Sequence, residues 1–221
     1  MRATAILPVK RFAHAKTRLL DVIGPRERAA LLKAMLGDVL EAIDATASVE
    51  RTIVVTAEGR AEKVAMEAAK QLRTPIEVFQ EPADSGHSEA ATLGIVRAKA
   101  LGAECVALLP GDCPLLDGAE LDGALARMEP ATVAVIPDRH GTGTNGLMMA
   151  PPDAIGPGFG PGSRERHLDR AGRAGWRAVL EALPSLGLDI DTPDDLAKLR
   201  ARVEQRPEDA PRTARALAEI P

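Results

Sequence analysis

The chain has 221 residues and a formal net charge of −4 at pH 7. This length suffices for one sizeable α/β domain whose core needs neither disulfides nor a structural metal. Because the charge is slightly negative and no dense block of Lys and Arg occurs, the attraction that drives nucleic-acid binding has no source, and we expect no nucleic-acid partner.

Cysteine usage and hydropathy predict a cytoplasmic protein. The two cysteines, Cys105 and Cys113, have no Cys/His spacing typical of a metal site around them. No long apolar segment follows a basic start, and no stretch is long enough to span a bilayer. We therefore expect reduced thiols, a cytoplasmic location and no membrane partner.

A basic run follows the first expected strand, residues 3–7, which Pro8 ends. The run carries four cations: Lys10, Arg11, Lys16 and Arg18. Cations directly after a strand are well placed to meet a polyanionic ligand, although a solvated basic turn explains them equally simply. The glycine spacing of a Walker loop is absent, so any phosphate site here depends on side-chain cations.

Helical and strand periodicities then alternate along the chain. We expect helices at residues 25–45, 60–73, 89–101 and 117–128, and strands at 52–56, 76–79, 105–109, 132–136 and 147–149. Such alternation predicts a mostly parallel central sheet, with right-handed crossovers and helices on both faces. The fold class is therefore a single-domain, Rossmann-like α/β fold.

Two polar segments are candidate parts of a ligand site in this sheet. The loop at 80–88 contains Ser85 and Ser88, which are candidate helix caps or lining for a base or ribose pocket. The strand at 105–109 breaks at Pro110 and Gly111, which places Asp112 at its carboxyl end. Asp112 is suited to hold a divalent cation there, or it simply caps the helix that begins near Asp117.

Residues 138–146 and 157–163 are rich in glycine and short polar side chains. The second segment precedes a helix that begins near Arg164 and carries Arg166 and His167. Ser163 is a good N-cap for that helix, and a helix N-terminus attracts anions. The segment is a second candidate phosphate site, and the alternative is an ordinary capped helix after a Gly/Pro loop.

The last part of the chain offers two more carboxylates. Alternation around Ile190 puts Asp189 and Asp191 on the same side of an extended segment, where they repel each other unless a cation lies between them. Thr192 or Asp191 also makes a good cap for the following helix. Residues 176–183 fit either a strand or a helix, and we expect residues 207–221 to form a loosely attached tail.

Five segments, taken together and in order, resemble one known family. They are Leu7-Pro8-Val9-Lys10 with Ala15-Lys16-Thr17-Arg18-Leu19, Gly111-Asp112-Cys113-Pro114, Gly141-Thr142-Gly143-Thr144-Asn145, Phe159-Gly160-Pro161-Gly162-Ser163 and Asp189-Ile190-Asp191-Thr192-Pro193. The chain thereby resembles the phosphoenolpyruvate and 2-phospho-L-lactate guanylyltransferases of coenzyme F420 biosynthesis. The resemblance covers residues 1–206, as one nucleotidyltransferase domain with a fold like that of the molybdopterin guanylyltransferases.

The resemblance also implies roles for single residues. It implies Asp112, Asp189 and Asp191 as ligands of Mg²⁺, and Thr144, Gly160 and Ser163 as the site of the acceptor phosphate. Lys10, Lys16 and Arg18 would face the phosphates of GTP, with Lys16 and Arg18 joining Asp112 in catalysis. Where relatives often carry a Leu-Asn pair, this chain has Ser88 and Glu89, which we assign with Gly111 to nucleotide binding.

The expected reaction is transfer of GMP from GTP to the phosphate of a small phosphorylated acid, with release of pyrophosphate. Phosphoenolpyruvate is the first expectation for the acid, ahead of 2-phospho-L-lactate and 3-phospho-D-glycerate. A downstream F420-pathway transferase and a second copy of the chain are the expected protein partners. Two alternatives stay open: a nucleotide-sugar-dependent glycosyltransferase of related fold, and a non-catalytic GTP-binding regulator.

Overall fold

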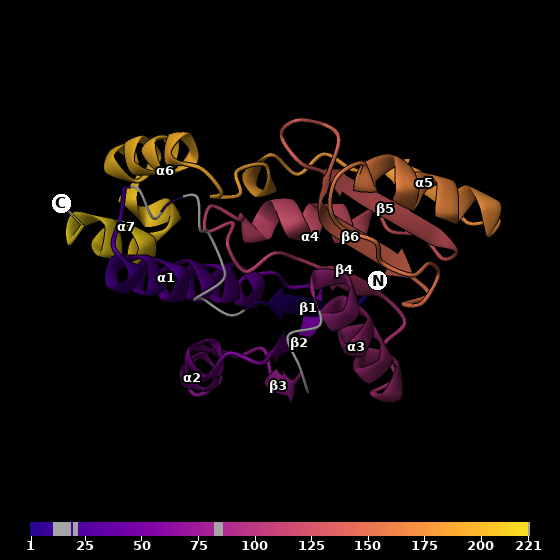
Figure 1. Cartoon of the computed structure of the whole chain (residues 1–221). Coiled ribbons are helices and arrows are strands. Elements are labelled where there is room, and N and C mark those ends of the chain that lie inside the picture. Colours follow the sequence, from indigo (N-terminus) through magenta and orange to yellow (C-terminus); the bar gives the residue numbers. More distant parts are fainter. Residues whose placement is uncertain (11–18, 20–21, 82–85, 221) are drawn as a thin grey trace.

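The computed structural model describes residues 1–10, 19, 22–81 and 86–220. Its described strands form one sheet with the order β3-β2-β1-β4-β6-β5-β7 (Figure 1). The strands are β1 (Ala3–Val9), β2 (Val49–Thr56), β3 (Ile76–Gln80), β4 (Val106–Leu108), β5 (Thr132–Pro137), β6 (Thr144–Ala150) and β7 (Arg177–Leu180). Residues 176–183, for which the sequence allowed either structure, thus include an edge strand.

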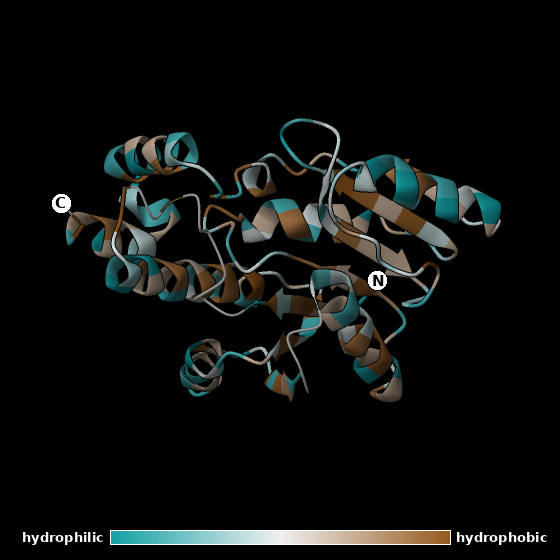
Figure 2. Ribbon diagram, viewed as in Figure 1, coloured by the Kyte–Doolittle hydropathy of each residue, from teal (hydrophilic) through white to brown (hydrophobic). Residues whose placement is uncertain are grey.

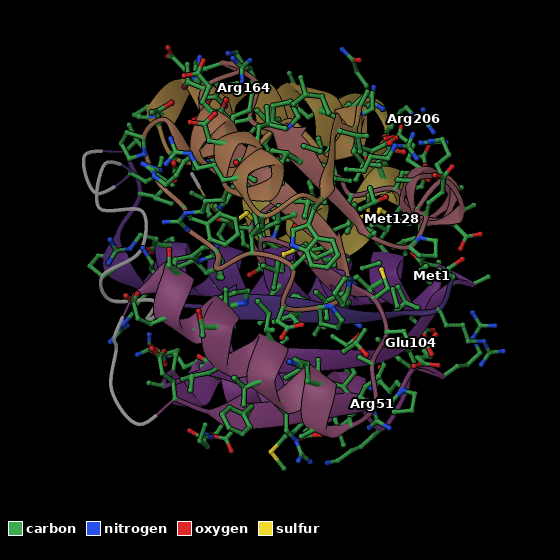
Figure 3. The ribbon with its side chains drawn as sticks, turned by 90° about the vertical axis from the view of Figure 1, so that its right-hand side faces the viewer. Met1, Arg51, Glu104, Met128, Arg164 and Arg206 are labelled. Atoms are coloured by element: carbon green, nitrogen blue, oxygen red, sulfur yellow. The ribbon has the colours of Figure 1, made fainter. Side chains whose placement is uncertain are left out.

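Strand direction decides which side chains meet at each edge of the sheet. β1, β2, β3 and β4 are parallel to one another, whereas β6 runs antiparallel to both of its neighbours. Leu108 near the carboxyl end of β4 pairs with Leu147, so the amino end of β6 lies at the same edge. In Figure 3, Met1, Arg51 and Glu104 gather at the opposite edge, where β1, β2 and β4 begin.

The order of strands reverses between β1 and β4, since β2 and β3 continue to one side and β6, β5 and β7 to the other. In open α/β sheets such a reversal leaves a crevice beyond the carboxyl ends of the strands, where ligands bind. The prediction of a mostly parallel sheet in one α/β fold is therefore confirmed, with β6 as the antiparallel exception.

Helices cover both faces of the sheet, as expected. On one face, α1 (Pro25–Asp44), α2 (Gly59–Ala68) and α4 (Gly118–Ala126) share a core with Ala5 and Leu7 of β1. On the other face, α3 (His87–Ala100) packs against Ile6 and Ile53, and α5 (Ser163–Arg173) adds Ala171 to the same core. The sheet strands are largely brown in Figure 2, while α5 is largely teal. Successive side chains of β1 point to opposite faces of the sheet and so pack in two different hydrophobic cores.

The close approach of α3 to the sheet depends on a glycine. A Cβ atom at Gly94 would lie 2.3 Å from Cγ2 of Ile6 and 3.1 Å from Cγ2 of Val55. Such distances are below van der Waals contact, so only glycine lets the helix pack this closely.

No helix among the described residues is both long and apolar enough to cross a lipid bilayer.

The C-terminal segment corrects one expectation. Beyond α6 (Pro193–Gln205), residues expected to be loosely attached form a 3-10 turn (Pro207–Asp209) and helix α7 (Pro211–Ala218), which packs beside α1 (Figure 1). The buried carboxylate of Asp38 on α1 accepts hydrogen bonds from the backbone N–H groups of Arg212 and Thr213, at 3.0 and 2.8 Å. Leu217 and Ile220 are buried. The many charged residues of this segment had predicted a loose tail, although Leu217 and Ile220 are apolar and buried.

Candidate active site

A cleft of about 380 Å³ lies beyond the carboxyl ends of β1 and β4. Polar side chains from five different segments reach it. Its lining comprises Lys10, His87, Ser88, Glu89, Pro110, Asp112, Thr144, Asn145, Phe159, Gly160, Asp189 and Asp191. Because β1, β4 and the amino end of β6 share this edge, residues far apart in the sequence come together here.

Most of the residues predicted for the site line this one cleft. They are Lys10, Ser88, Glu89, Asp112, Thr144, Gly160, Asp189 and Asp191. Two predicted residues are not part of the lining: Ser163 is buried at the start of α5, and the backbone of Gly111 lies between Val9 and Leu36. Lys16 and Arg18 lie outside the described residues.

Asp112 follows β4 after the break at Pro110 and faces the cleft. Asp117, five residues later, is the N-cap of α4, and its Oδ1 accepts hydrogen bonds from the N–H groups of Ala119 and Glu120 at 2.7 and 3.0 Å. The simpler alternative, in which Asp112 caps this helix, is therefore wrong. Asp112 lines the cleft instead.

Asp189 and Asp191 flank the buried Ile190 in the sequence, and both line the cleft. Asp195, three residues beyond Thr192, holds this segment. Its Oδ2 accepts hydrogen bonds from the N–H of Asp191 at 3.1 Å and from the N–H and hydroxyl of Thr192, both at 2.8 Å. Thr192 in turn caps α6, so the carboxylate pair precedes a rigid capping box.

A cation lies behind the same carboxylates. Nη1 of Arg139 is 2.7 Å from Oδ1 of Asp195 and 3.9 Å from Oδ1 of Asp189, and it donates a hydrogen bond to the backbone oxygen of Asp189 at 3.3 Å. Burial alone would raise the pKa of the Asp195 carboxyl, but the hydrogen bonds from Arg139 and Thr192 outweigh it and hold that pKa below its usual value. Asp195 is therefore a carboxylate throughout the neutral range.

A second wall of the cleft includes Phe159 and Gly160, which belong to the loop between β6 and α5. Gly160 and Gly162 adopt φ angles of +109° and +68°, which disfavour any residue with a Cβ atom. The prediction that Ser163 is the N-cap of α5 is wrong. The N-cap is Gly162, which has a left-handed conformation and provides no side-chain hydrogen bond to the helix. The buried hydroxyl of Ser163 has no hydrogen-bond partner among the described residues.

His167 links this loop to β6. Its ring is fully buried, with Nδ1 3.0 Å from the Thr144 hydroxyl and Nε2 accepting a hydrogen bond from the N–H of Gly158 at 2.9 Å. Burial, followed by the nearby Arg170 and Arg166 charges, lowers the pKa of His167 to about 4. The sequence pointed to His167 as a residue of the helix, but not to these contacts.

The cations of this wall have different partners. Arg166 donates to the backbone oxygens of Gly158 at 3.1 Å and Pro161 at 2.7 Å, so it holds the loop. Arg164 lies 3.4 Å from the carboxylate of Glu165, and Figure 3 shows it on the side of the molecule away from the starts of β1 and β2. Arg166 is thus committed to the structure of the loop, which the sequence did not reveal.

The cleft carboxylates do not form a complete metal cage. Within residues 1–10, 19, 22–81 and 86–220, no three His, Cys, Asp or Glu side chains lie together closely enough to hold a metal ion alone. Asp112, Asp189 and Asp191 nevertheless line one cleft. Hard oxygen ligands in this arrangement suit a cation that completes its coordination with water and ligand oxygens.

The fold is shared with known structures of low sequence identity. A crystal structure of a protein from Desulfovibrio desulfuricans, described as a nucleotide-diphospho-sugar transferase, superposes with a TM-score of 0.74. The match covers 99% of this chain and 95% of that chain at 21% identity. At that identity the similarity concerns the fold alone.

Sequence similarity identifies the family. Residues 3–206 match the family described as "Guanylyl transferase CofC like". A phosphoenolpyruvate guanylyltransferase of Conexibacter woesei is 43% identical over 208 residues, which is 93% of this chain and 91% of the relative. The same-named protein of Sphaerobacter thermophilus is 35% identical over 199 residues, or 90% and 93% of the two chains. The chain therefore belongs to the CofC-like guanylyl transferase family and is a nucleotidyltransferase.

Proposed function

We propose that this protein transfers GMP from GTP to the phosphate of phosphoenolpyruvate, releasing pyrophosphate, as a step of coenzyme F420 biosynthesis. The observation that carries the proposal is the cleft at the reversal of strand order. Its lining includes Asp112, Asp189 and Asp191, which we call the first wall, and Thr144 and Gly160, which we call the second wall. The names of the two relatives favour phosphoenolpyruvate over 2-phospho-L-lactate and 3-phospho-D-glycerate as the acceptor.

The reaction needs position and charge more than proton transfer. An oxygen of the acceptor phosphate attacks the α-phosphorus of GTP, a phosphoanhydride bond forms, and the bond from the α-phosphorus to the bridging oxygen breaks as pyrophosphate leaves. A phosphate monoester loses its second proton near pH ~6, so the nucleophile is already anionic at neutral pH. The cleft accordingly has no need of a general base.

Mg²⁺ is the proposed metal, and Asp112, Asp189 and Asp191 are its proposed ligands. Mg²⁺ in nucleotide sites is commonly bound by about one or two carboxylates together with substrate phosphates and water, which suits a cleft without a complete protein cage. When bound, the ion neutralises charge on the phosphates. Binding of Mg²⁺ is therefore expected to be weak without GTP and to tighten when GTP is added, as calorimetry would measure.

The remaining assignments divide the cleft into two halves. On the nucleotide side we assign Lys10, Lys16 and Arg18 to the phosphates of GTP, with Ser88, Glu89 and Gly111 nearby. On the acceptor side we assign Thr144, Gly160 and Ser163 to the phosphate of the acid. The positive charge of the first group would stabilise the charge that develops on the leaving pyrophosphate.

The test is pyrophosphate release from GTP and Mg²⁺ with each of the three acids, in the presence of the downstream F420-pathway transferase that we propose consumes the product in the cytoplasm. Pyrophosphate release with phosphoenolpyruvate, but with neither of the other two acids, supports the proposal. Transfer of a sugar from a nucleotide sugar would show a glycosyltransferase instead. GTP binding without pyrophosphate release with any acid would show a regulator. The proposed homodimer is tested separately by light scattering.

Two matched variants test the site. Asp112→Asn should lower kcat by about 1000-fold, because it removes a charged oxygen ligand of the proposed Mg²⁺. Asp117→Asn, five residues away, keeps a good helix cap and should leave the rate within about twofold. Equal rates for the two variants would contradict the role of Asp112, and circular dichroism would confirm that both variants fold.

A further inference from the structure

The hydrogen bonds of His167 determine where the proton of its ring lies. The N–H of Gly158 can only donate, so Nε2 of His167, 2.9 Å away, accepts and carries no proton. A neutral ring then carries its proton on Nδ1, which is 3.0 Å from the hydroxyl oxygen of Thr144. His167 therefore donates to Thr144, and the direction of this hydrogen bond is fixed by the backbone.

The surroundings keep the ring neutral. His167 is fully buried on α5, and the edge of its ring meets Phe159 with a centroid separation of 5.4 Å. The charged groups that act on it are the guanidinium groups of Arg166 and Arg170 on the same helix, which with burial lower its pKa to about 4. A doubly protonated ring would also lose the hydrogen bond from Gly158.

The direction of this bond gives the Thr144 hydroxyl a defined role. A hydroxyl has one proton to donate, and an oxygen that accepts from His167 keeps that proton available. The described residues give the Thr144 hydroxyl no other partner, and Thr144 lines the same cleft as Gly160. The free O–H is thus placed to donate to an acceptor-only group, such as an oxygen of a phosphate.

We propose that His167 is a positioning residue, which makes the Thr144 hydroxyl a dedicated hydrogen-bond donor to the phosphate of the acceptor. This inference rests on the proposed function for the identity of the ligand, but its hydrogen-bond geometry does not. His167 touches no substrate and acts through Thr144.

The same ring also fixes the loop that faces Thr144. Gly158 is held by His167 and by Arg166, and the N–H of Phe159 donates to the hydroxyl of Ser88 at 3.0 Å. The Phe159 ring meets His87 edge-on, with centroids 4.7 Å apart. A purely structural role for His167 would act through this loop, so the experiment has to separate the Thr144 contact from the Gly158 contact.

Two substitutions make that separation. In His167→Gln the side-chain oxygen can reach the position of Nε2 and accept from Gly158, while the donor to Thr144 is lost. In His167→Asn the amide nitrogen takes the position of Nδ1 and donates to Thr144, while the acceptor for Gly158 is lost. Arg173→Gln, on the exposed end of the same helix, is the control for a general effect on α5.

We expect His167→Gln to raise the KM for phosphoenolpyruvate, and its Kd in calorimetry, by about 10- to 100-fold, as for a lost hydrogen bond to a charged group. The KM for GTP should change by less than about threefold, and His167→Asn should stay within about threefold of the unmodified protein for both substrates. Thr144→Val should match His167→Gln, and the double variant should be no worse than either single one.

Two results with these variants would overturn the proposal. One is a greater loss of phosphoenolpyruvate affinity in His167→Asn than in His167→Gln, which would assign the role to the loop. The other is a multiplicative loss in the double variant, which would show that His167 and Thr144 act independently.

Nitrogen NMR of the ring gives a readout without substrate. A protonated Nδ1 and an unprotonated Nε2 between about pH 5 and 8 are expected, and the opposite tautomer would refute the proposal. If the unmodified protein binds phosphoenolpyruvate but releases no pyrophosphate, the proposed function fails while the binding test of His167 still holds. If it does not bind phosphoenolpyruvate, the proposal that Thr144 serves that ligand is overturned whatever the tautomer.

Discussion

The two walls of the cleft are built on opposite electrostatic principles. Behind Thr144 lies the buried, neutral ring of His167, held by a backbone N–H and a hydroxyl. Behind Asp189 and Asp191 lies the buried, ionised carboxylate of Asp195, which faces the guanidinium of Arg139. Each wall thus has one buried titratable group that orients the residues at the surface of the cleft.

The difference follows from what each wall is proposed to bind. An acceptor phosphate is recognised well by neutral donors, and a neutral histidine can fix a donor without adding charge. A cation needs carboxylates close together, and Arg139 reduces their mutual repulsion when no other cation is near. The two walls should therefore fail under different conditions, and five substitutions test this contrast.

The largest effect on stability is expected on the ionic wall. Asp195→Ala removes an ion pair with Arg139 and three hydrogen bonds from Asp191 and Thr192, and it should cost about 4 kcal/mol of unfolding free energy. Urea unfolding measures this cost. Asp195→Ala should also slow GMP transfer, since the segment that carries Asp189 and Asp191 loses the hydrogen bonds that orient it.

The neighbouring residue supplies the control for Asp195. Asp194 is exposed in the first turn of the same helix, and Asp194→Ala should cost no more than about 0.5 kcal/mol. Similar losses for the two variants would mean that helix charge, and not the buried carboxylate, stabilises this wall.

The neutral wall should be the first to weaken in acid. The pKa of His167 is about 4 in the folded protein, against 6.5 for an ordinary histidine, so between these values the unfolded chain binds the extra proton. The neutral ring of His167 contributes fully to the unfolding free energy above pH 6.5. This contribution, about 3 kcal/mol, is lost as the pH falls toward 4. The pKa of Asp195 lies below its usual value, so that contribution persists to lower pH.

Urea unfolding at a series of pH values measures this loss, and His167→Asn isolates it. The variant lacks the titrating ring, so its stability should change less between pH 6.5 and 4 than that of the unmodified protein. Parallel pH profiles for the two proteins would show that carboxylates alone cause the acid sensitivity.

Much of the fold followed from local patterns. The apolar spacing of residues 25–45 and the proline at its start predicted α1 almost residue by residue, since both are properties of one helix. The antiparallel direction of β6 was not predictable in this way, because strand direction is decided by partners distant in the sequence. The attachment of α7 likewise depends on Asp38, far away on α1.

For the site, spacing predicted the residues at the surface but not those behind them. Asp112 was recognisable because it follows the break of a strand at Pro110. The segment of Thr144 was recognisable by its glycines and short polar side chains, and that of Asp189 by the alternation around Ile190. The roles assigned to them stay predictions. Asp195 was detectable as the fourth residue of a Thr-x-x-Asp capping pattern, whereas His167 shows its burial only through the four-residue spacing with Ser163 and Ala171.

The smallest effect should separate backbone strain from packing on the neutral wall. Nothing lies within 4 Å of a Cβ atom built at Gly162 or at Gly172, but only Gly162 has a positive φ, of +68°. Gly162→Ala should therefore destabilise the protein by about 1 kcal/mol, while Gly172→Ala, inside α5, should stabilise it by up to about 1 kcal/mol. Thermal unfolding measures both. No atom clashes in either variant. Changes of opposite sign in the unfolding free energy would therefore show that the conformation of the loop before α5 depends on the backbone freedom of Gly162. Changes of equal sign would contradict this.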